Sequence, residues 1–79
     1  MSKYTPLKGY LSGLPSGTYE KTIPFSQIER LLDDKLPPSA FQYRPWWANS
    51  GHSQADAWRQ AGRKVHSVAL GKSITFEKN

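Results

Sequence analysis

The segment Arg44–Lys64, RPWWANSGHSQADAWRQAGRK, decides how the rest of this chain can fold. It contains all three tryptophans of the 79-residue chain. A buried tryptophan removes roughly 150–250 Å² of surface from water. A chain of this length has only a small hydrophobic core, so its tryptophans must form the core, a binding surface or both.

Within this segment, residues 54–61 show the pattern of a helix. Ser53, followed three residues later by Asp56, is a capping signal for its first turn, and Gly62 suits its C-terminal end. At 100° per residue, Trp58 lies on one face of this helix together with two alanines. The opposite face carries the polar residues Asp56, Arg59, Gln60 and Arg63. We therefore expect Trp58 in the core and an Arg-Gln-Arg surface facing solvent.

Two further helices are predicted before this segment. Thr5 can cap a helix with Pro6 at its first position, and Gly13 ends it. Apolar side chains then recur at helical spacing, at Leu7, Tyr10, Leu11 and Leu14. A short β-rich run over 19–25 follows. The second helix begins at Ser26, where Glu29 completes a capping box, and it ends at Leu36 before two prolines.

After the Arg44–Lys64 segment, two β-like runs over 65–70 and 73–76 predict a hairpin, and the last three residues are expected to fray. A two-residue turn at Gly71-Lys72 would place Leu70 opposite Ser73. A three-residue loop pairs Leu70 with Ile74 and Val68 with Phe76, which matches apolar side chains better. We favour the longer loop.

The order of elements predicts an α+β fold over one domain, residues 1–79. Three main helices and a C-terminal β-hairpin, joined by a short strand before the second helix, are typical of a winged helix-turn-helix-like domain. The connection from Asp34 to Ser53 is longer than the tight turn of a helix-turn-helix. The similarity is therefore one of element order.

Composition favours a polyanionic partner. Eleven Lys and Arg residues stand against six Asp and Glu residues, and the isoelectric point is about 9.8, which suits nucleic acid. Five of these basic residues fall between positions 40 and 72, against one acidic residue. There is no cysteine, no N-terminal apolar signal and no membrane-length apolar run, so we expect a cytoplasmic location.

Catalytic motifs are missing from the sequence. It has no Cys nucleophile, no Gly-x-Ser-x-Gly and no Gly-rich phosphate loop. Asp33 and Asp34 are adjacent on a predicted helix and point about 100° apart. His52 and His66 are distant in sequence, with no carboxylate ligand evident nearby. We expect a protein that is not an enzyme, with no cofactor and no metal.

Double-stranded DNA is the expected partner, bound through the third helix and the preceding Trp-Trp turn. Arginine and glutamine on an exposed helix face can reach base edges and phosphates, and a helix N-terminus favours phosphate. An aromatic side chain in a turn can stack on a base. The candidate nucleic-acid-binding residues are Arg44, Trp47, Asn49, His52, Ser53, Gln54, Arg59, Gln60, Arg63 and Lys64.

Alternatives remain for each of these features. Arg59 and Arg63 can be an ordinary solvated pair, and Asn49 can cap a turn. One tryptophan of Trp46-Trp47 is expected to be buried and the other partly exposed, where it can close the core instead of stacking on a base. The alternative function is a protein-interaction module, such as a phage or plasmid accessory protein or an inhibitor of a host factor, that uses an exposed Trp.

Several short motifs also resemble those of a small bacterial domain family of unknown function. Its mark is Trp46-Trp47-x-Asn49 followed by Gln54-x-x-Ala57-Trp58-x-x-Ala61-Gly62. The further matches are Tyr4-x-Pro6-Leu7-x-x-Tyr10-Leu11, Phe25-x-x-Ile28-Glu29-x-x-Leu32, Leu36-Pro37-x-Ser39-Ala40 and Val65. Members of that family resemble modules joined to nucleases and restriction systems, so the resemblance implies a role near DNA. In that family, the residue after Ala-Gly is often Trp, whereas here it is Arg63.

Overall fold

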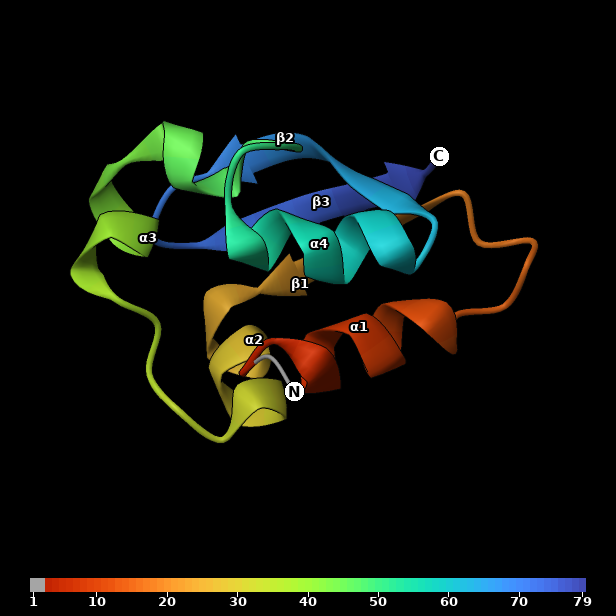
Figure 1. Ribbon diagram of the computed structural model, residues 1–79, viewed down its shortest axis with the longest axis horizontal. Coiled ribbons are helices and arrows are strands. Elements are labelled where there is room, and N and C mark those ends of the chain that lie inside the picture. The colour runs from red at the N-terminus through yellow and green to blue at the C-terminus, as the bar shows by residue number, and fades with distance from the viewer. Residues whose placement is uncertain (1–2) are drawn as a thin grey trace.

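The computed structural model describes residues 3–79, which form a helical layer packed on a small sheet. In chain order the elements are α1 (Thr5–Ser12), β1 (Glu20–Pro24), α2 (Phe25–Leu32), α3 (Pro38–Gln42), the 3₁₀ helix η1 (Arg44–Trp47), α4 (Ser53–Gln60), β2 (Arg63–Ala69) and β3 (Ser73–Lys78). Figure 1 shows α4 between α1 and the strands β2 and β3, with α2 beside α1.

The three strands form one antiparallel sheet in the order β1-β3-β2. Ile23 of β1 pairs with Ile74 of β3, and Val65 of β2 pairs with Phe76 of β3. The strand before the second helix therefore joins the C-terminal hairpin, as the sequence predicts. The α+β class is confirmed.

The two faces of the sheet have different chemistry, as expected for a sheet covered on one side. Ile23, Ile74 and Phe76 are fully buried under the helices. The opposite side, here called the outer face, is polar, and on it the hydroxyls of Thr22 and Thr75 lie 2.9 Å apart in a hydrogen bond. The helices can thus cover only the inner face.

Tryptophan side chains hold α4 against this inner face. Trp58 is completely buried, and its ring centroid lies 5.8 Å from that of Trp47 in a stacked arrangement and 5.6 Å from that of Phe76. The prediction that Trp58 is a core residue is confirmed. Its indole Nε1 has no hydrogen-bond partner among residues 3–79, so Trp58 contributes through apolar area and ring contacts.

The second helix is shorter than its apolar pattern indicates. It ends at Leu32 because Asp33 adopts a left-handed conformation with φ 53°. Glu29 forms no capping box; its carboxylate accepts a hydrogen bond of 2.9 Å from the backbone N–H of Leu36. Leu36 is nevertheless buried, because the chain folds back over the core after the helix ends.

The predicted side-chain caps of the first and third helices are also wrong. Tyr4 and His52 occupy the N-cap positions of α1 and α4, and neither makes a side-chain capping bond. Thr5 and Ser53 already lie inside the first turns, one position too late to cap them. Pro6 does lie in the first turn of α1, and Gly62 follows α4 with φ 77°.

The hairpin has the predicted three-residue loop, but its position is shifted by one residue. Ala69 pairs with Ser73, so Leu70 is part of the loop and Val68 pairs with Ile74. A β-bulge at His66 then lets Val65 pair with Phe76. Strict alternation cannot place Val65 and Val68 on the same face, and the extra residue of a bulge removes this conflict.

The last residues do not fray as expected. β3 continues through Lys78, and the backbone N–H of Asn79 donates to the carbonyl of Gly62 at 2.9 Å. Glu77 is therefore held within the sheet. Among residues 3–79, no helix combines the length and the apolar character needed to cross a bilayer.

Replacing Trp58 with alanine should reduce the free energy of unfolding by roughly 3–5 kcal/mol, because it leaves a large cavity between Trp47 and Phe76. Trp58→Phe should cost less, since the indole N–H has no hydrogen bond to lose within residues 3–79. Chemical denaturation of both variants measures the difference. A Trp58→Ala protein as stable as the parent would contradict the packing described above.

Candidate nucleic-acid interface

The outward side of α4 has the composition that its helical phase predicts. Arg59 and Gln60 are exposed, as are Ser53 and Asp56, whereas Trp58 points into the core. His52 is exposed just before the helix begins. Within residues 3–79, neither Arg59 nor Gln60 takes part in a side-chain hydrogen bond or ion pair that would occupy it. Their donors are therefore available to a partner.

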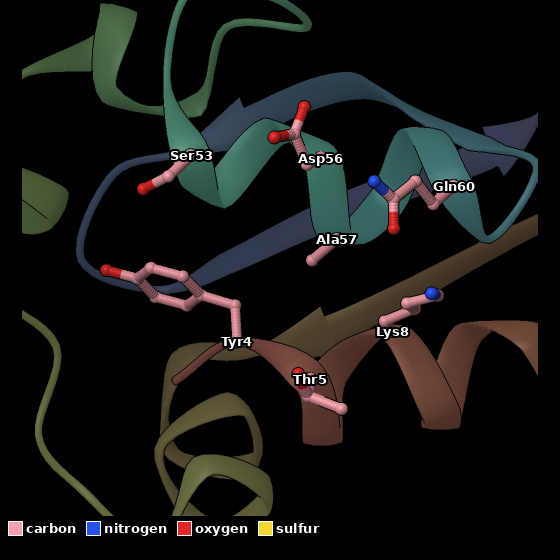
Figure 2. Close-up of a pocket in the computed structure, with 7 residues that line it drawn as sticks. All are labelled: Tyr4, Thr5, Lys8, Ser53, Asp56, Ala57 and Gln60. Atoms are coloured by element: carbon pink, nitrogen blue, oxygen red, sulfur yellow. The ribbon is translucent and has the colours of Figure 1, made fainter. Parts of the chain in front are cut away.

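A shallow groove of about 210 Å³ separates α4 from α1. Its walls are formed by Tyr4, Thr5 and Lys8 of the α1 region and by Ser53, Asp56, Ala57 and Gln60 of α4. Figure 2 shows Lys8 and Gln60 on opposite sides of this groove, with the Asp56 carboxylate directed away from α1. The groove adds a cation from α1 to the polar face of α4. It is mixed in charge because of Asp56.

Arg63 does not belong to this exposed face. It begins β2, is only 4% exposed, and donates from Nη1 to the carbonyl of Thr18 at 2.6 Å and to that of Tyr19 at 3.3 Å. The prediction of an Arg-Gln-Arg surface is wrong at this position, because the helix ends at Gln60 and the helical phase does not extend past Gly62. Arg63 joins β2 to the loop before β1.

Trp47 is likewise unavailable for stacking on a base. It is 2% exposed, and its indole Nε1 donates to the carbonyl of Ala40 at 2.9 Å. Trp46 is partly buried, with its ring centroid 4.7 Å from that of Trp47 and 6.0 Å from that of Tyr4. The expectation of one buried and one partly exposed tryptophan is confirmed, but the candidate residue is the buried one.

Arg44 and Asn49 pack along the free edge of β2. The Asn49 amide accepts from the Val65 N–H at 2.8 Å and donates to the Val65 carbonyl at 3.2 Å. Arg44 donates to the carbonyl of Val68 at 2.9 Å. Edge strands present unpaired backbone groups, and these two side chains satisfy some of them. These two bonds use one N–H and one oxygen lone pair of the Asn49 amide and fix its orientation at the strand edge.

Gln54 and Lys64 are also engaged within the chain. Gln54 is 6% exposed and donates to the carbonyl of Trp46 at 2.9 Å, so it cannot reach a partner from the surface. Lys64 forms an ion pair with Glu77, with Nζ 3.4 Å from the carboxylate. This pair lies on the outer face of the sheet, away from the exposed side of α4.

Of the predicted residues, Ser53, Arg59 and Gln60 stay exposed on α4, and Lys8 lies across the groove from Gln60. We use the name α4 surface for Lys8, Ser53, Arg59 and Gln60. The sequence did not indicate Lys8 as a binding residue, because it lies in the first helix, far in sequence from residues 44–64. Its spacing of four from Tyr4 does place both on one helical face, but only the packing of α1 on α4 shows which element that face meets.

These features define a small α+β domain whose helices cover one face of a three-stranded antiparallel sheet. Residues 4–79 match a family described as a domain of unknown function, DUF7662, and the chain belongs to that family. No curated protein and no solved structure matches the chain significantly.

Arg63 and Arg59 should respond very differently to replacement by alanine. Arg63→Ala should destabilise the protein by at least ~1.5 kcal/mol, because it removes charged hydrogen bonds to two backbone carbonyls. Arg59→Ala should stay within about ±0.5 kcal/mol, as exposed substitutions usually do. Urea denaturation of the two variants provides the test. Equal effects would show that Arg63 is not a structural residue.

Proposed function

We propose that this domain binds double-stranded DNA through the α4 surface. The observation that carries the proposal is that one face of α4 is anchored in the core while the opposite face is exposed. Trp58 is completely buried and anchors the helix. Arg59 and Gln60 are exposed on its outward side. Arginine can donate to phosphates and to guanine, and glutamine to adenine, when a helix enters the major groove.

Net charge supports a polyanionic partner. The excess of five positive charges is large for 79 residues, and such a balance favours association with nucleic acid. Lys8 extends the basic character across the groove from α4. Ser53 lies in the first turn of α4, where unpaired N–H groups and the helix dipole favour a phosphate oxygen.

The topology is compatible with a winged-helix mode of binding. In such a mode α4 is the recognition helix and the β2–β3 hairpin is the wing. Lys72, in the hairpin loop, is exposed and could contact the DNA backbone. The long connection between α2 and α4, which contains α3 and η1, distinguishes this chain from a tight helix-turn-helix.

Asp56 offers a substitution that should strengthen DNA binding, whereas replacing a basic residue should weaken it. Its carboxylate is exposed on α4, between Ser53 and Gln60 along the helix. If DNA approaches this face, the carboxylate repels nearby phosphates, and its removal should strengthen binding. If DNA instead binds elsewhere on the protein, replacing Asp56 should change the affinity no more than replacing any other exposed acidic residue.

A protein-interaction module is the second candidate, and one observation favours it. Tyr43 is 56% exposed, and the partly buried Trp46 lies three residues further along the chain. Exposed aromatic side chains are enriched at protein interfaces. A contact of this kind would depend weakly on salt, whereas DNA binding weakens steeply as salt rises.

Duplex binding measured by fluorescence anisotropy on random DNA, at several salt concentrations, separates these possibilities. Arg59→Ala should weaken binding and reduce the slope of log K against log salt by about one, because one phosphate contact is lost. Asp56→Asn should tighten binding. Arg63→Ala is unsuitable for this test, since its side chain supports the fold.

Arg30→Ala is the matched control. Arg30 is an exposed arginine on α2, outside the α4 surface, and its removal changes the net charge by the same amount. If Arg30→Ala and Arg59→Ala weaken binding equally, the α4 surface is not the interface. If the parent protein binds no duplex even at low salt, the DNA proposal fails and the aromatic pair Tyr43 and Trp46 becomes the next target.

A further inference from the structure

The outer face of the sheet carries a cluster of metal-ligating side chains that lies apart from the α4 surface. Glu20 of β1 pairs directly with Glu77 of β3, so both carboxylates project from this face. His66 belongs to the bulge of β2. A bulge sends two consecutive residues toward the same face, and here it allows His66 to join the outer face while Val65 still packs inward.

One ligand atom from each of Glu20, His66 and Glu77 lies within 4.8 Å of the others. The His66 Nδ1 is 3.2 Å from a carboxylate oxygen of Glu77. The three residues come from three different strands. Glu20 and His66 are more than forty positions apart in the sequence. The expectation that His66 has no carboxylate nearby is therefore wrong, because sheet pairing supplies two.

Electrostatics favours a cation at this position. Like charges directly opposite each other on neighbouring strands are destabilising. Lys64 and His66 both contact Glu77, whose side chain is only 12% exposed. Glu20 forms no ion pair that would balance its charge within residues 3–79. A divalent ion held by both carboxylates would remove the repulsion between them.

We propose that Glu20, His66 and Glu77 bind a Zn²⁺ ion on the outer face of the sheet. Zinc accepts one imidazole nitrogen together with carboxylate oxygens at about 2.0–2.2 Å, with a fourth position open to water. Tetrahedral ligands at that distance lie roughly 3.3 Å apart. The present separations of up to 4.8 Å require only small side-chain rotations, which the exposed positions of Glu20 and His66 permit.

Lys64 is the competitor for this site. Its ammonium lies 3.4 Å from Glu77, and its side chain is 45% exposed, so it can move into solvent when a metal binds. Removing Lys64 should therefore strengthen zinc binding. A cluster that serves only as an ion-pair network predicts no such gain, which makes this variant the sharpest discriminator.

The experiment is isothermal titration of ZnCl₂ into the untagged full chain, together with thermal melts at increasing zinc. The expected result is one zinc ion per chain and a Tm that rises with zinc concentration; at ~100 times the Kd, the rise for a domain of this size is on the order of 10 °C. His66→Ala and Glu20→Gln should each weaken binding by more than about tenfold, because loss of even an outer-shell partner costs 10–100-fold. Lys64→Gln should tighten it.

His52→Ala is the matched control, since His52 is an exposed histidine outside the cluster. Zinc binding that is lost equally in His52→Ala and His66→Ala would overturn the proposal, as would a parent protein that binds no zinc. All the substituted side chains in the cluster lie on the outer face, so circular dichroism should show an unchanged fold. The α4 surface shares no residue with this cluster, so the two proposals can fail separately.

Discussion

The stacking of Trp58 against Trp47 is the contact on which the rest of the structure depends. These two indoles lie 5.8 Å apart, between Phe25 on one side and Phe76 on the other. The contact joins η1 to α4, and the Trp58–Phe76 contact joins α4 to the central strand. In a domain with so small a core, large aromatic rings supply much of the buried apolar area. The positions of α4, the sheet and the loop after α3 all follow from it.

The polar residues around this aromatic core complete the backbone hydrogen bonding. Trp47 donates to Ala40, Gln54 donates to Trp46, and Asn49 pairs with both backbone groups of Val65. Buried and edge backbone groups must find partners. The segment between α3 and α4 supplies two of these side chains, because Trp47 bonds to a carbonyl of α3 and Asn49 to β2, and Gln54 of α4 bonds to a carbonyl within the segment. The Trp-Trp-x-Asn pattern is therefore a structural motif in this chain.

Because the core and its polar contacts use the inner residues, two separate surfaces remain for binding. The helical side presents the α4 surface beside a groove shared with α1. The outer face of the sheet presents Glu20, His66 and Glu77, of which Glu20 and His66 are exposed. A sheet covered on one face necessarily exposes the other. We propose DNA for the first surface and zinc for the second, and each rests on different residues.

Local patterns in the sequence determined the order of the elements, the burial of Trp58 and the exposure of Arg59, because helical periodicity and turn residues act over a few positions. Only the tertiary structure decided which polar side chains remain free. Arg63 follows the helical phase of Arg59 on paper, yet it is buried because the chain turns at Gly62 and begins a strand. His66 and Glu77 meet Glu20 through sheet register and a bulge, which long-range pairing sets and no local pattern encodes.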